Sequence, residues 1–399
     1  MLVSMTSAPR GPFGAARNPG SQSALRELNQ RRIVDVLGSG PATQAELARA
    51  TGLSTATISN LVKIMTAAGV VETEPTTSSG RRALSVRLSN TGAVAVGIDF
   101  GRRHLRVVVC TLGYQVVAEQ SIELPVGHGA NESIDRAAEL LAQLLDANGI
   151  SAASVLGAGV GIPGPIDRQK GTVVQGSILP EWVGIHLPDL QDRLGIPVLF
   201  DNDANLGALA EVTWGPHKSV DNLAFVKIGT GIGCGLILNG RTHYGNRGVA
   251  GEIGHDTAVE NGVLCHCGNR GCLETVASTS VMIGLLGRGR PVPLTTSDIV
   301  RQALEGDPAT LRVVDDAGVA IGRALATVAN LVNPEVIVVG GPLCALGAIF
   351  LEPIRRGLMR HAVPSVGEST RLVMSALGER AEALGAAALV LQGASRGSS

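Results

Sequence analysis

The sequence predicts an α/β protein of two unequal parts, a small helical head followed by a large domain with a mixed sheet. At 399 residues the chain exceeds what one hydrophobic core usually serves, so two or three domains are expected. A turn-rich junction, Ser89-Asn90-Thr91-Gly92, separates a helical first segment from the rest. Beyond this junction β-rich runs alternate with helical runs, which is typical of α/β folds with a mixed sheet.

Composition and charge narrow the class of protein further. Apolar residues make up 45% of the chain and charged residues 17%, which is a globular composition. The net charge of -1 hides an asymmetry, because the first 88 residues hold ten Lys/Arg against five Asp/Glu and therefore carry +5, against -6 for the remainder. A basic head on an acidic body favours a polyanion as the partner of the head alone, and a chance surface imbalance is the alternative.

Targeting and membrane signals are missing from the sequence. Arg10 and Arg17 have no apolar run between them, so the N-terminus does not resemble a signal peptide. The longest uncharged apolar stretch, Val336–Leu351, is short for a membrane span and contains Gly340-Gly341-Pro342. We therefore expect a cytoplasmic protein with no membrane partner.

The first 90 residues divide into an arm and a head. Residues 1–23 have no periodicity and are expected to form a flexible N-terminal arm, so the predicted domains are this arm, a head over 24–90 and a large domain over 91–399. A helix is expected from Ala24 to the stop at Gly38-Ser39-Gly40-Pro41, and residues 42–88 should hold two short helices and a hairpin. The apolar positions of the first helix fall roughly on one face: Leu25, Leu28, Ile33, Val36 and Leu37.

The large domain should begin with a meander of three strands, followed by β and α segments in turn. The predicted strands are 94–99, 105–112, 115–124, 155–162, 198–201, 223–228, 234–238, 336–339 and 372–375. The predicted helices are 132–148, 204–213, 308–331 and 380–392.

The stretch from Thr43 to Val62 has the steric pattern of a helix-turn-helix. Ala48 is small where the first helix must approach the second, and Gly52 lies where the turn needs a positive φ. Ser54 can cap the second helix, whose apolar residues at helical spacing face the core. The outward positions hold residue types that contact base edges and phosphates: Thr55, Thr57, Ser59, Asn60 and Lys63.

A wing is predicted after these helices. The β-like runs 70–72 and 84–88 flank a loop that contains Pro75 and ends with Gly80-Arg81-Arg82. Arg81 and Arg82 are placed to touch phosphates or to enter a minor groove. Double-stranded DNA is therefore the predicted partner of a winged helix-turn-helix, and a small helical protein-interaction module is the alternative.

Two motifs of the large domain indicate a ligand site. Asp201-Asn202-Asp203 follows an apolar strand, so an amide and a carboxylate lie at the carboxyl edge of a sheet, where α/β ligand sites form. Such a pair can hold sugar hydroxyls, and the carboxylate could act as a general base, although Asx residues at a helix start are often only caps. The glycine-rich hairpin 229–235 either approaches a phosphate or is a tight turn with no ligand.

Four soft ligands near the middle of the chain have the composition of a structural zinc site. The set is His255, Cys265, Cys267 and Cys272, with His266 as a competing ligand. Gly268 and Gly271 permit the turn that brings three thiolates together. Three clustered cysteines favour a metal in a reducing compartment over a disulfide framework. With four protein ligands, Zn²⁺ should organise the loop and not catalyse.

Together these segments resemble the ROK family, which groups bacterial sugar kinases with repressors that carry an added helix-turn-helix. The match runs from about Val94 to the C-terminus, and the head resembles that of the xylose and N-acetylglucosamine regulators. The family's diagnostic Cys-x-Cys-Gly-x-x-Gly-Cys-x-Glu stands complete at Cys265–Glu274. The resemblance implies a two-lobed actin-like, RNase H-like sugar-kinase fold with a cleft near 200–275. It implies that these residues contact sugar hydroxyls: Asn202, Asp203, Glu252, His255 and Glu274.

The resemblance also implies roles around the cleft. Asp203 is the catalytic base in kinase members, and His255 would bind zinc through one nitrogen and face the sugar with the other. Residues 161–165 would border the cleft, and Gly340-Gly341 would lie by the nucleotide in a kinase.

One segment departs from the kinase pattern Asp-x-Gly-Gly-Thr-Lys. This chain has Asp99-Phe100-Gly101-Arg102-Arg103-His104, so Arg102 replaces a glycine that lets phosphate approach, and Arg103 replaces the threonine hydroxyl. Arginines bind phosphate electrostatically, so the change weakens ATP binding without excluding it.

These observations predict a DNA-binding transcription regulator of carbohydrate metabolism, expected to be a repressor, that is controlled by a sugar or sugar derivative. We expect a homodimer or a dimer of dimers on a DNA operator, and no catalytic residue. The rival hypothesis is an ATP-dependent ROK sugar kinase with an accessory head, in which Asp203 is catalytic. A third is a sensor that answers to a protein partner and binds no sugar.

Overall fold

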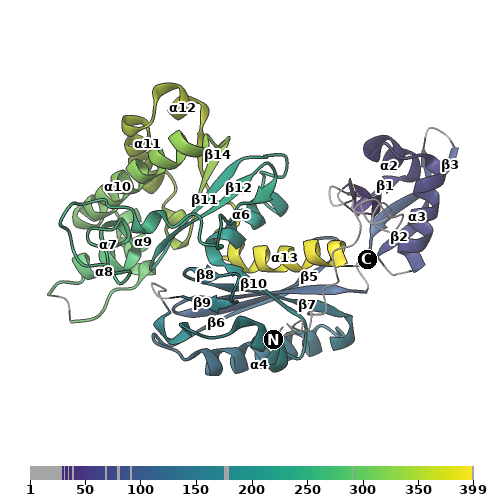
Figure 1. Cartoon of the computed structure of the whole chain (residues 1–399), viewed down its shortest axis with the longest axis horizontal. Helices are drawn as coiled ribbons and strands as arrows, with labels where there is room; N and C mark the ends of the chain where they lie inside the picture. The colour runs from purple at the N-terminus through teal and green to yellow at the C-terminus, as the bar shows by residue number, and fades with distance from the viewer. Residues whose placement is uncertain are drawn as a thin grey trace, which may run out of the picture.

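The computed structural model describes the chain except residues 1–28, 31, 35, 38–39, 68–69, 79–80, 90–91, 175–178, 290 and 398–399. Figure 1 shows a small head set beside a larger body, in which two sheets lie on either side of a long C-terminal helix. The predicted N-terminal arm lies outside the described residues, as do Asn90 and Thr91 of the predicted junction.

The head has the element order predicted for a winged helix-turn-helix. The described residues between 29 and 37 are helical, and they are followed by β1 (Ala42–Thr43), α2 (Gln44–Thr51), α3 (Thr55–Ala67), β2 (Val71–Ser78) and β3 (Arg81–Leu88). The strands form one antiparallel sheet in the order β1-β3-β2. Residues from all of these segments except β1 share one buried core: Ile33, Leu37, Leu47, Ile58, Leu61, Val62, Met65, Val71, Val86 and Leu88.

The hairpin is longer than the sequence predicted. Pro75 was expected in the wing loop, yet it belongs to β2 and pairs with Leu84. Arg81 and Arg82 likewise belong to β3 and pair with Ser78 and Thr77. Since β2 is an edge strand, a proline in it removes no N–H that a further strand needs, and pairing continues past it.

The first lobe of the body, lobe 1, is built on a five-stranded mixed sheet in the order β10-β7-β4-β5-β6. The predicted meander is confirmed as β4 (Val94–Phe100), β5 (His104–Thr111) and β6 (Val116–Glu123), while β7 (Val155–Ile162) and β10 (Val198–Asn202) run parallel to β4. Helix α4 (Ala130–Ala147) packs on one face through apolar residues, and α13 (Ala381–Gly397) packs on the other. Bare glycine backbone allows this, because a Cβ on Gly97 would collide with the carbonyl of Ala383.

Lobe 2 is built on a second five-stranded sheet in the order β13-β12-β11-β14-β15. Its strands are β11 (Leu223–Ile228), β12 (Ile232–Leu238), β13 (Arg241–Thr242), β14 (Val336–Gly340) and β15 (Arg371–Met374). Its longer helices are α8 (Thr279–Leu286), α9 (Thr296–Leu304), α10 (Pro308–Val332) and α11 (Ala348–His361). Shorter elements complete the body: β8 (Ile166–Asp167), β9 (Thr172–Val173), α5 (Leu190–Leu194), α7 (Glu274–Ala277) and α12 (Pro364–Ser369).

Two helices lie between the lobes. Helix α6 (Asp203–Thr213) begins where β10 ends, and it packs against α13 so closely that a Cβ on Gly385 would meet the carbonyl of Leu206. One buried cluster joins Val108 of the first sheet and Phe225 of the second to Ala208 of α6 and Leu384 of α13. The predicted two-lobed kinase-type architecture is thus confirmed, and the carboxyl ends of both sheets meet near the start of α6.

Among the described residues, none of the helices combines the length and apolarity needed to cross a bilayer.

Candidate functional sites

The turn of the helix-turn-helix has the geometry that its sequence predicts. Gly52 follows α2 with a φ of +71°, and the Ser54 hydroxyl accepts a hydrogen bond from the Thr57 amide at 3.1 Å. A second cap was missed: Thr43 and Glu46 form a capping box, in which the Thr43 amide donates to Oε2 of Glu46 at 2.7 Å. The Thr-x-x-Glu spacing before an apolar run was the signal that could have found it.

Helix α3 presents a polar face opposite its buried one. Thr55, Asn60 and Lys63 are exposed, and Thr57 and Ser59 are half-buried. The opposite face is buried in the head core through Ile58, Leu61, Val62 and Met65. The face that the sequence assigned to DNA is therefore available to a partner.

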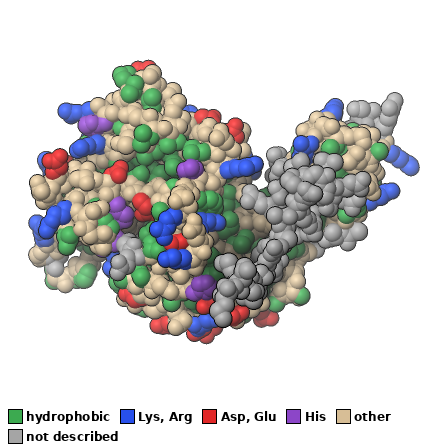
Figure 2. Space-filling model, in the orientation of Figure 1, with side chains coloured by type: hydrophobic (Ala, Val, Ile, Leu, Met, Phe, Trp, Pro, Cys, Tyr) green, Lys and Arg blue, Asp and Glu red, His purple; other side chains and the backbone are tan. Residues whose placement is uncertain are grey.

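The hairpin carries three arginines, two near its tip and one in ion pairs at its base. Arg82 is exposed near the tip, and Arg81 lies beside the tip in β3. Arg87 at the base is paired with both Glu72 and Glu74 at 2.9 Å, so its charge is already compensated. Figure 2 shows Lys and Arg side chains on the visible face of the head.

The Asp201–Asp203 motif lies at the carboxyl end of β10, where the lobes meet. Asn202 caps α6, because its Oδ1 accepts from the Ala204 amide at 2.9 Å, and its Nδ2 donates to the carbonyl of Gly164 at 2.8 Å. The cap alternative is thus correct for Asn202, and the same side chain also ties α6 to the predicted 161–165 loop. The Asp203 carboxylate is nearly buried and accepts from the Ala204 amide at 2.8 Å and from Lys227 Nζ at 2.9 Å.

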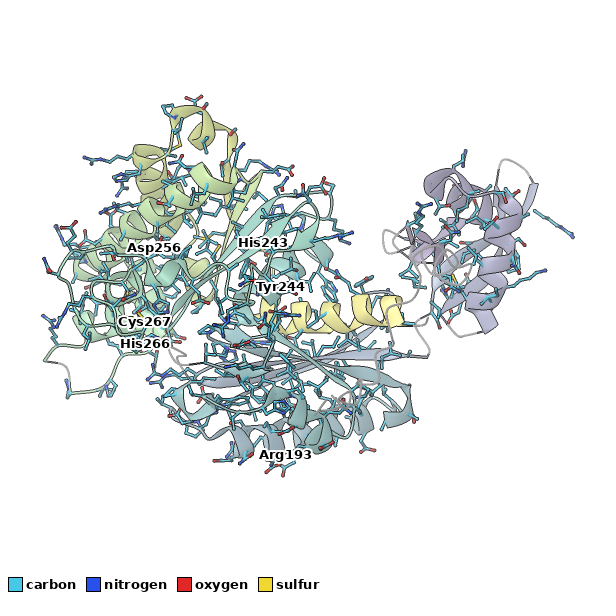
Figure 3. All side chains as sticks on the ribbon, in the orientation of Figure 1. Arg193, His243, Tyr244, Asp256, His266 and Cys267 are labelled. Atoms are coloured by element: carbon cyan, nitrogen blue, oxygen red, sulfur yellow. The ribbon has the colours of Figure 1, made fainter. Side chains whose placement is uncertain are left out.

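Asp201 joins residues that the sequence analysis left unassigned. Its Oδ2 accepts from Arg168 at 3.1 Å and from the Tyr244 hydroxyl at 2.8 Å, and its Oδ1 accepts from Asn205 at 3.0 Å. The Arg168 guanidinium lies 3.9 Å from the centre of the Tyr244 ring. Burial raises the pKa of Tyr244, so its hydroxyl stays a donor. Tyr244 lies above the start of α13, between the lobes (Figure 3).

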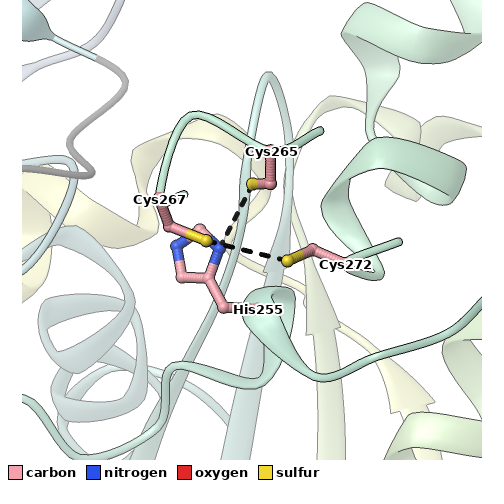
Figure 4. Close-up of side chains that lie close together, drawn as sticks. All are labelled: His255, Cys265, Cys267 and Cys272. Atoms are coloured by element: carbon pink, nitrogen blue, oxygen red, sulfur yellow. Dashed lines mark hydrogen bonds between the residues drawn. The ribbon is translucent and has the colours of Figure 1, made fainter. Parts of the chain in front are cut away.

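The predicted metal ligands come together in lobe 2. The ligand atoms of His255, Cys265, Cys267 and Cys272 all lie within 4.8 Å of one another. Cys265 Sγ is 3.7 Å from His255 Nδ1, and Cys267 Sγ is 3.7 Å from Cys272 Sγ (Figure 4). Gly268 and Gly271 have φ of +95° and +66°, as the turn requires. This Cys/His cluster can bind a metal ion.

His266 belongs to a second possible ligand group with Cys265 and Glu274. Its Nδ1 lies 3.8 Å from Cys265 Sγ and 3.3 Å from Glu274 Oε1. His266 is exposed and lies beside Cys267 in lobe 2 (Figure 3). It therefore links the metal cluster to Glu274 and remains the competing ligand that the sequence indicated.

The carboxyl groups of Asp203, Glu252 and Glu274 interact with one another beside the Cys/His cluster. His255 Nε2 is 3.8 Å from Glu252 Oε2, so the ring presents one nitrogen to the thiols and the other to this carboxyl group. Glu274 Oε2 accepts from the Ile232 amide at 2.9 Å. Burial, together with the neighbouring Asp203 and Glu274 charges, raises the pKa of Glu252 to about 7. The residues that the resemblance assigns to sugar therefore share one region, and sugar contact stays a prediction.

The two loops assigned to phosphate lie next to this region. Asp99 is buried at the end of β4 and contacts His104 Nε2 at 2.8 Å, while Arg102 is half-buried and Arg103 exposed. The glycine hairpin is closed by a bond from the Gly229 amide to the Gly231 carbonyl at 2.9 Å. Whether either loop approaches a phosphate stays a prediction.

The geometry defines a class of protein: a two-lobed sugar-kinase-like body with a winged helix-turn-helix at its N-terminus. A sequence model of the ROK family matches residues 95–393, and a MarR family model matches residues 27–82. The chain belongs to the ROK family, and its head is of the MarR type.

Three known proteins illustrate the similarity. A putative xylose repressor of Caldicellulosiruptor sp. is 28% identical over 389 residues, which cover 93% of this chain and 97% of that protein. A crystal structure of a ROK family transcriptional regulator, described as a homolog of the E. coli MLC protein, has a TM-score of 0.77 at 27% identity and covers 94% of this chain and 97% of its own. A ROK family glucokinase from Streptomyces griseus, solved with glucose and AMPPNP, has a TM-score of 0.67 at 28% identity and covers 75% of this chain and all of its own.

Proposed function

We propose that this protein is a transcription regulator of sugar metabolism, in which the head binds an operator and the body binds a sugar or sugar derivative. One observation carries the proposal: the same chain holds an exposed polar face on α3 and, in its body, a group of buried carboxylates beside the Cys/His cluster. The similarity to a named repressor over 93% of the chain supports this combination of roles. Such a protein would act as a repressor in the cytoplasm.

In the proposed DNA complex α3 enters the major groove and the hairpin follows the backbone. The base-facing side chains would be Thr55, Thr57, Ser59, Asn60 and Lys63, with Arg81 and Arg82 on phosphates or in the minor groove. A homodimer would place two heads on the two halves of a palindromic site, and two such dimers could pair.

The proposed sugar site lies between α6 and the metal cluster. Carboxylates and amides suit sugar hydroxyls, because they accept or donate several hydrogen bonds at fixed positions. The residues proposed to hold the sugar are Asn202, Asp203, Glu252, His255 and Glu274. A sugar would bias the lobes by its differential affinity for their two arrangements, and so change the spacing of the heads.

Structural Zn²⁺ is the metal that best fits the Cys/His cluster. With Zn–S bonds of about 2.3 Å, a tetrahedral site has sulfur atoms about 3.8 Å apart. The Cys267–Cys272 separation of 3.7 Å meets this requirement. The ion would be held by His255, Cys265, Cys267 and Cys272, and it would supply rigidity to the segment that positions His255 and Glu274.

An ATP-dependent sugar kinase is the second candidate function, favoured by the likeness of the body to the S. griseus glucokinase. It requires Asp203 as the base and a phosphate loop that tolerates Arg102 and Arg103. A coupled assay of ADP release with a panel of sugars tests it, and turnover that Asp203→Asn abolishes would establish the kinase.

DNA binding with a sugar titration tests the proposed regulator. Duplexes selected from a random library by the full-length protein would be titrated by fluorescence anisotropy at 150 mM salt, with and without D-xylose, D-glucose and N-acetyl-D-glucosamine. We expect a selected palindromic duplex and a change in its Kd with at least one sugar. Failure to bind any duplex, or a Kd that no sugar changes, would contradict the proposal.

A further inference from the structure

Lys227 is a largely buried cation at the centre of the body, and it belongs neither to the Cys/His cluster nor to the predicted sugar residues. Its Nζ lies 2.9 Å from Oδ2 of Asp203 and 3.3 Å from Oε1 of Glu382, and only 16% of its side chain is exposed. Asp203 is the first residue of α6, and Glu382 lies in the first turn of α13. One ammonium therefore links β11 to both helices that lie between the lobes.

A third carboxylate belongs to the same cluster. Asp99, at the end of β4 in lobe 1, is fully buried, and although burial raises its pKa, Lys227 and the hydrogen bond with His104 hold it below its usual value. Burial alone would lower the pKa of Lys227, but Asp203, Glu382 and Asp99 raise it well above its usual value. The ammonium is thus charged at neutral pH, it contacts Asp203 and Glu382, and the charge of Asp99 acts on it as well.

The pairing with Lys227 favours Asp203 as a hydrogen-bond acceptor over Asp203 as a proton acceptor. Its Oδ1 already accepts from the Ala204 amide and its Oδ2 from Lys227. Each carboxylate oxygen has two lone pairs, so each can still accept one hydrogen bond from a sugar hydroxyl. Taking the proton itself would remove the negative charge that balances Lys227 in a buried site, where an unpaired charge is expensive.

We propose that Lys227 fixes Asp203 as an acceptor for a sugar hydroxyl and that the cleft binds a free, uncharged sugar in preference to its phosphate ester. The inference rests on the proposed sugar-binding function and names the ligand class of that site. Lys227 acts here as a positioning residue, and the surrounding carboxyl groups exclude the phosphate.

The charge balance of the cluster supports this preference. A phosphate on the hydroxyl that faces Asp203 would stand among three carboxyl groups, and the cations beside them are already paired: Lys227 with Asp203 and Glu382, and His104 with Asp99. Arg106, the other cation near Asp99, is occupied by Glu119 at 2.7 Å. Placing like charges side by side is unfavourable, whereas an uncharged sugar leaves the charge balance as it is.

The experiment is calorimetric titration of the full-length, zinc-loaded protein with D-xylose, D-glucose and N-acetyl-D-glucosamine, each against its terminal phosphate ester. We expect at least one free sugar to bind and its ester to bind at least about 100-fold more weakly. An ester that binds as tightly as its free sugar, or more tightly, would overturn the inference and leave the proposed regulator intact. If neither form of any sugar binds, the proposed sugar-binding function itself fails, and this inference fails with it.

Two substitutions test the role of Lys227 directly. Lys227→Met should weaken binding of the free sugar by about 10- to 100-fold, because Asp203 loses its counter-charge, while Lys227→Arg should restore most of the affinity. Lys218→Met, the same replacement at an exposed lysine, is the matched control and should bind sugar as the wild type does. Wild-type affinity in Lys227→Met, with its zinc content intact, would show that Lys227 does not position Asp203. If Lys227→Met does not fold, the arginine variant and the wild-type sugar–ester comparison still decide the inference.

Discussion

The head and the region between the two lobes use polar side chains in opposite ways. On α3 polar residues are exposed or half-buried, and the apolar residues behind them support the helix. Between the lobes the carboxylates Asp201 and Asp203 are buried, and each is paired within the protein: Asp203 with Lys227, and Asp201 with Arg168 and Tyr244. The polar face of the head can therefore be predicted from residue spacing along the chain. The chemistry of the region between the lobes depends instead on which distant residues the fold brings together.

The largest expected effect on the body alone is loss of the proposed zinc ion. Cys267→Ser should remove one of three thiolates, abolish stoichiometric zinc and weaken sugar binding by more than about 10-fold, because the segment that carries His255 and Glu274 loses its brace. Metal analysis by mass spectrometry and calorimetry with the best sugar measure both. The control is Cys344→Ser, whose thiol lies outside the cluster. Full zinc occupancy in Cys267→Ser would contradict the ligand assignment.

The next largest effect should come from Asp203. In Asp203→Asn the amide keeps the shape but leaves Lys227 without one counter-charge, and it replaces a carboxylate acceptor of the proposed sugar site by an amide. We expect sugar affinity to fall by about 100-fold, with operator affinity in the absence of sugar unchanged. Anisotropy on the selected duplex and calorimetry give the two numbers. A large loss of operator affinity would show that the head and the cleft are not separable in this way.

A smaller effect, confined to the head, is expected at the hairpin tip. Replacing Arg81 and Arg82 by alanine should weaken operator binding about 10-fold and reduce the salt dependence of log Kd by about 1 to 2, while sugar binding stays the same. The matched control is Arg87→Ala on the same strand, because Arg87 is already neutralised by Glu72 and Glu74. An unchanged salt slope in the double variant would remove the tip from the DNA contacts.

The smallest predicted effect concerns the pH dependence of stability in lobe 1. Although burial lowers the pKa of His104, its hydrogen bond and charge interaction with Asp99 raise it overall. A raised folded-state pKa gives stability that is present below the unfolded value near 6.5 and lost as pH rises through the folded value. Since two-fifths of the His104 side chain is exposed, the effect should be below about 1 kcal/mol. Urea unfolding at pH 6 and pH 8 should show a smaller difference in His104→Gln than in the wild type.

Features that depend on neighbours along the chain could be predicted from the sequence. The Gly52 turn, the Ser54 cap and the Cys/His set are spaced by local geometry, and each is found where the sequence put it. The length of the hairpin was not predicted, because the residues from Pro75 to Arg82 were assigned to a loop, although an edge strand tolerates a proline.

The partners of the buried charges could not be predicted in the same way. Asp203, Lys227 and Glu382 come from three elements that only the tertiary fold brings together. A signal did exist, since Lys227 is the one charged residue in the otherwise apolar run Leu223–Ile228. A lysine inside a buried strand requires partners, but the sequence does not say which carboxylates supply them.

Helix α13 connects the cluster around Lys227 to the start of the strand that follows the head. Its first turn holds Glu382 against Lys227, and its later residues Val390 and Leu391 pack on Ala95, at the root of the strand that leads out of the head. At 1.5 Å per residue, its 17 residues form a rod of about 25 Å. A tilt of about 5° at the Glu382 end would therefore displace the other end by about 2 Å, which is the scale of the helix shifts seen in allosteric transitions.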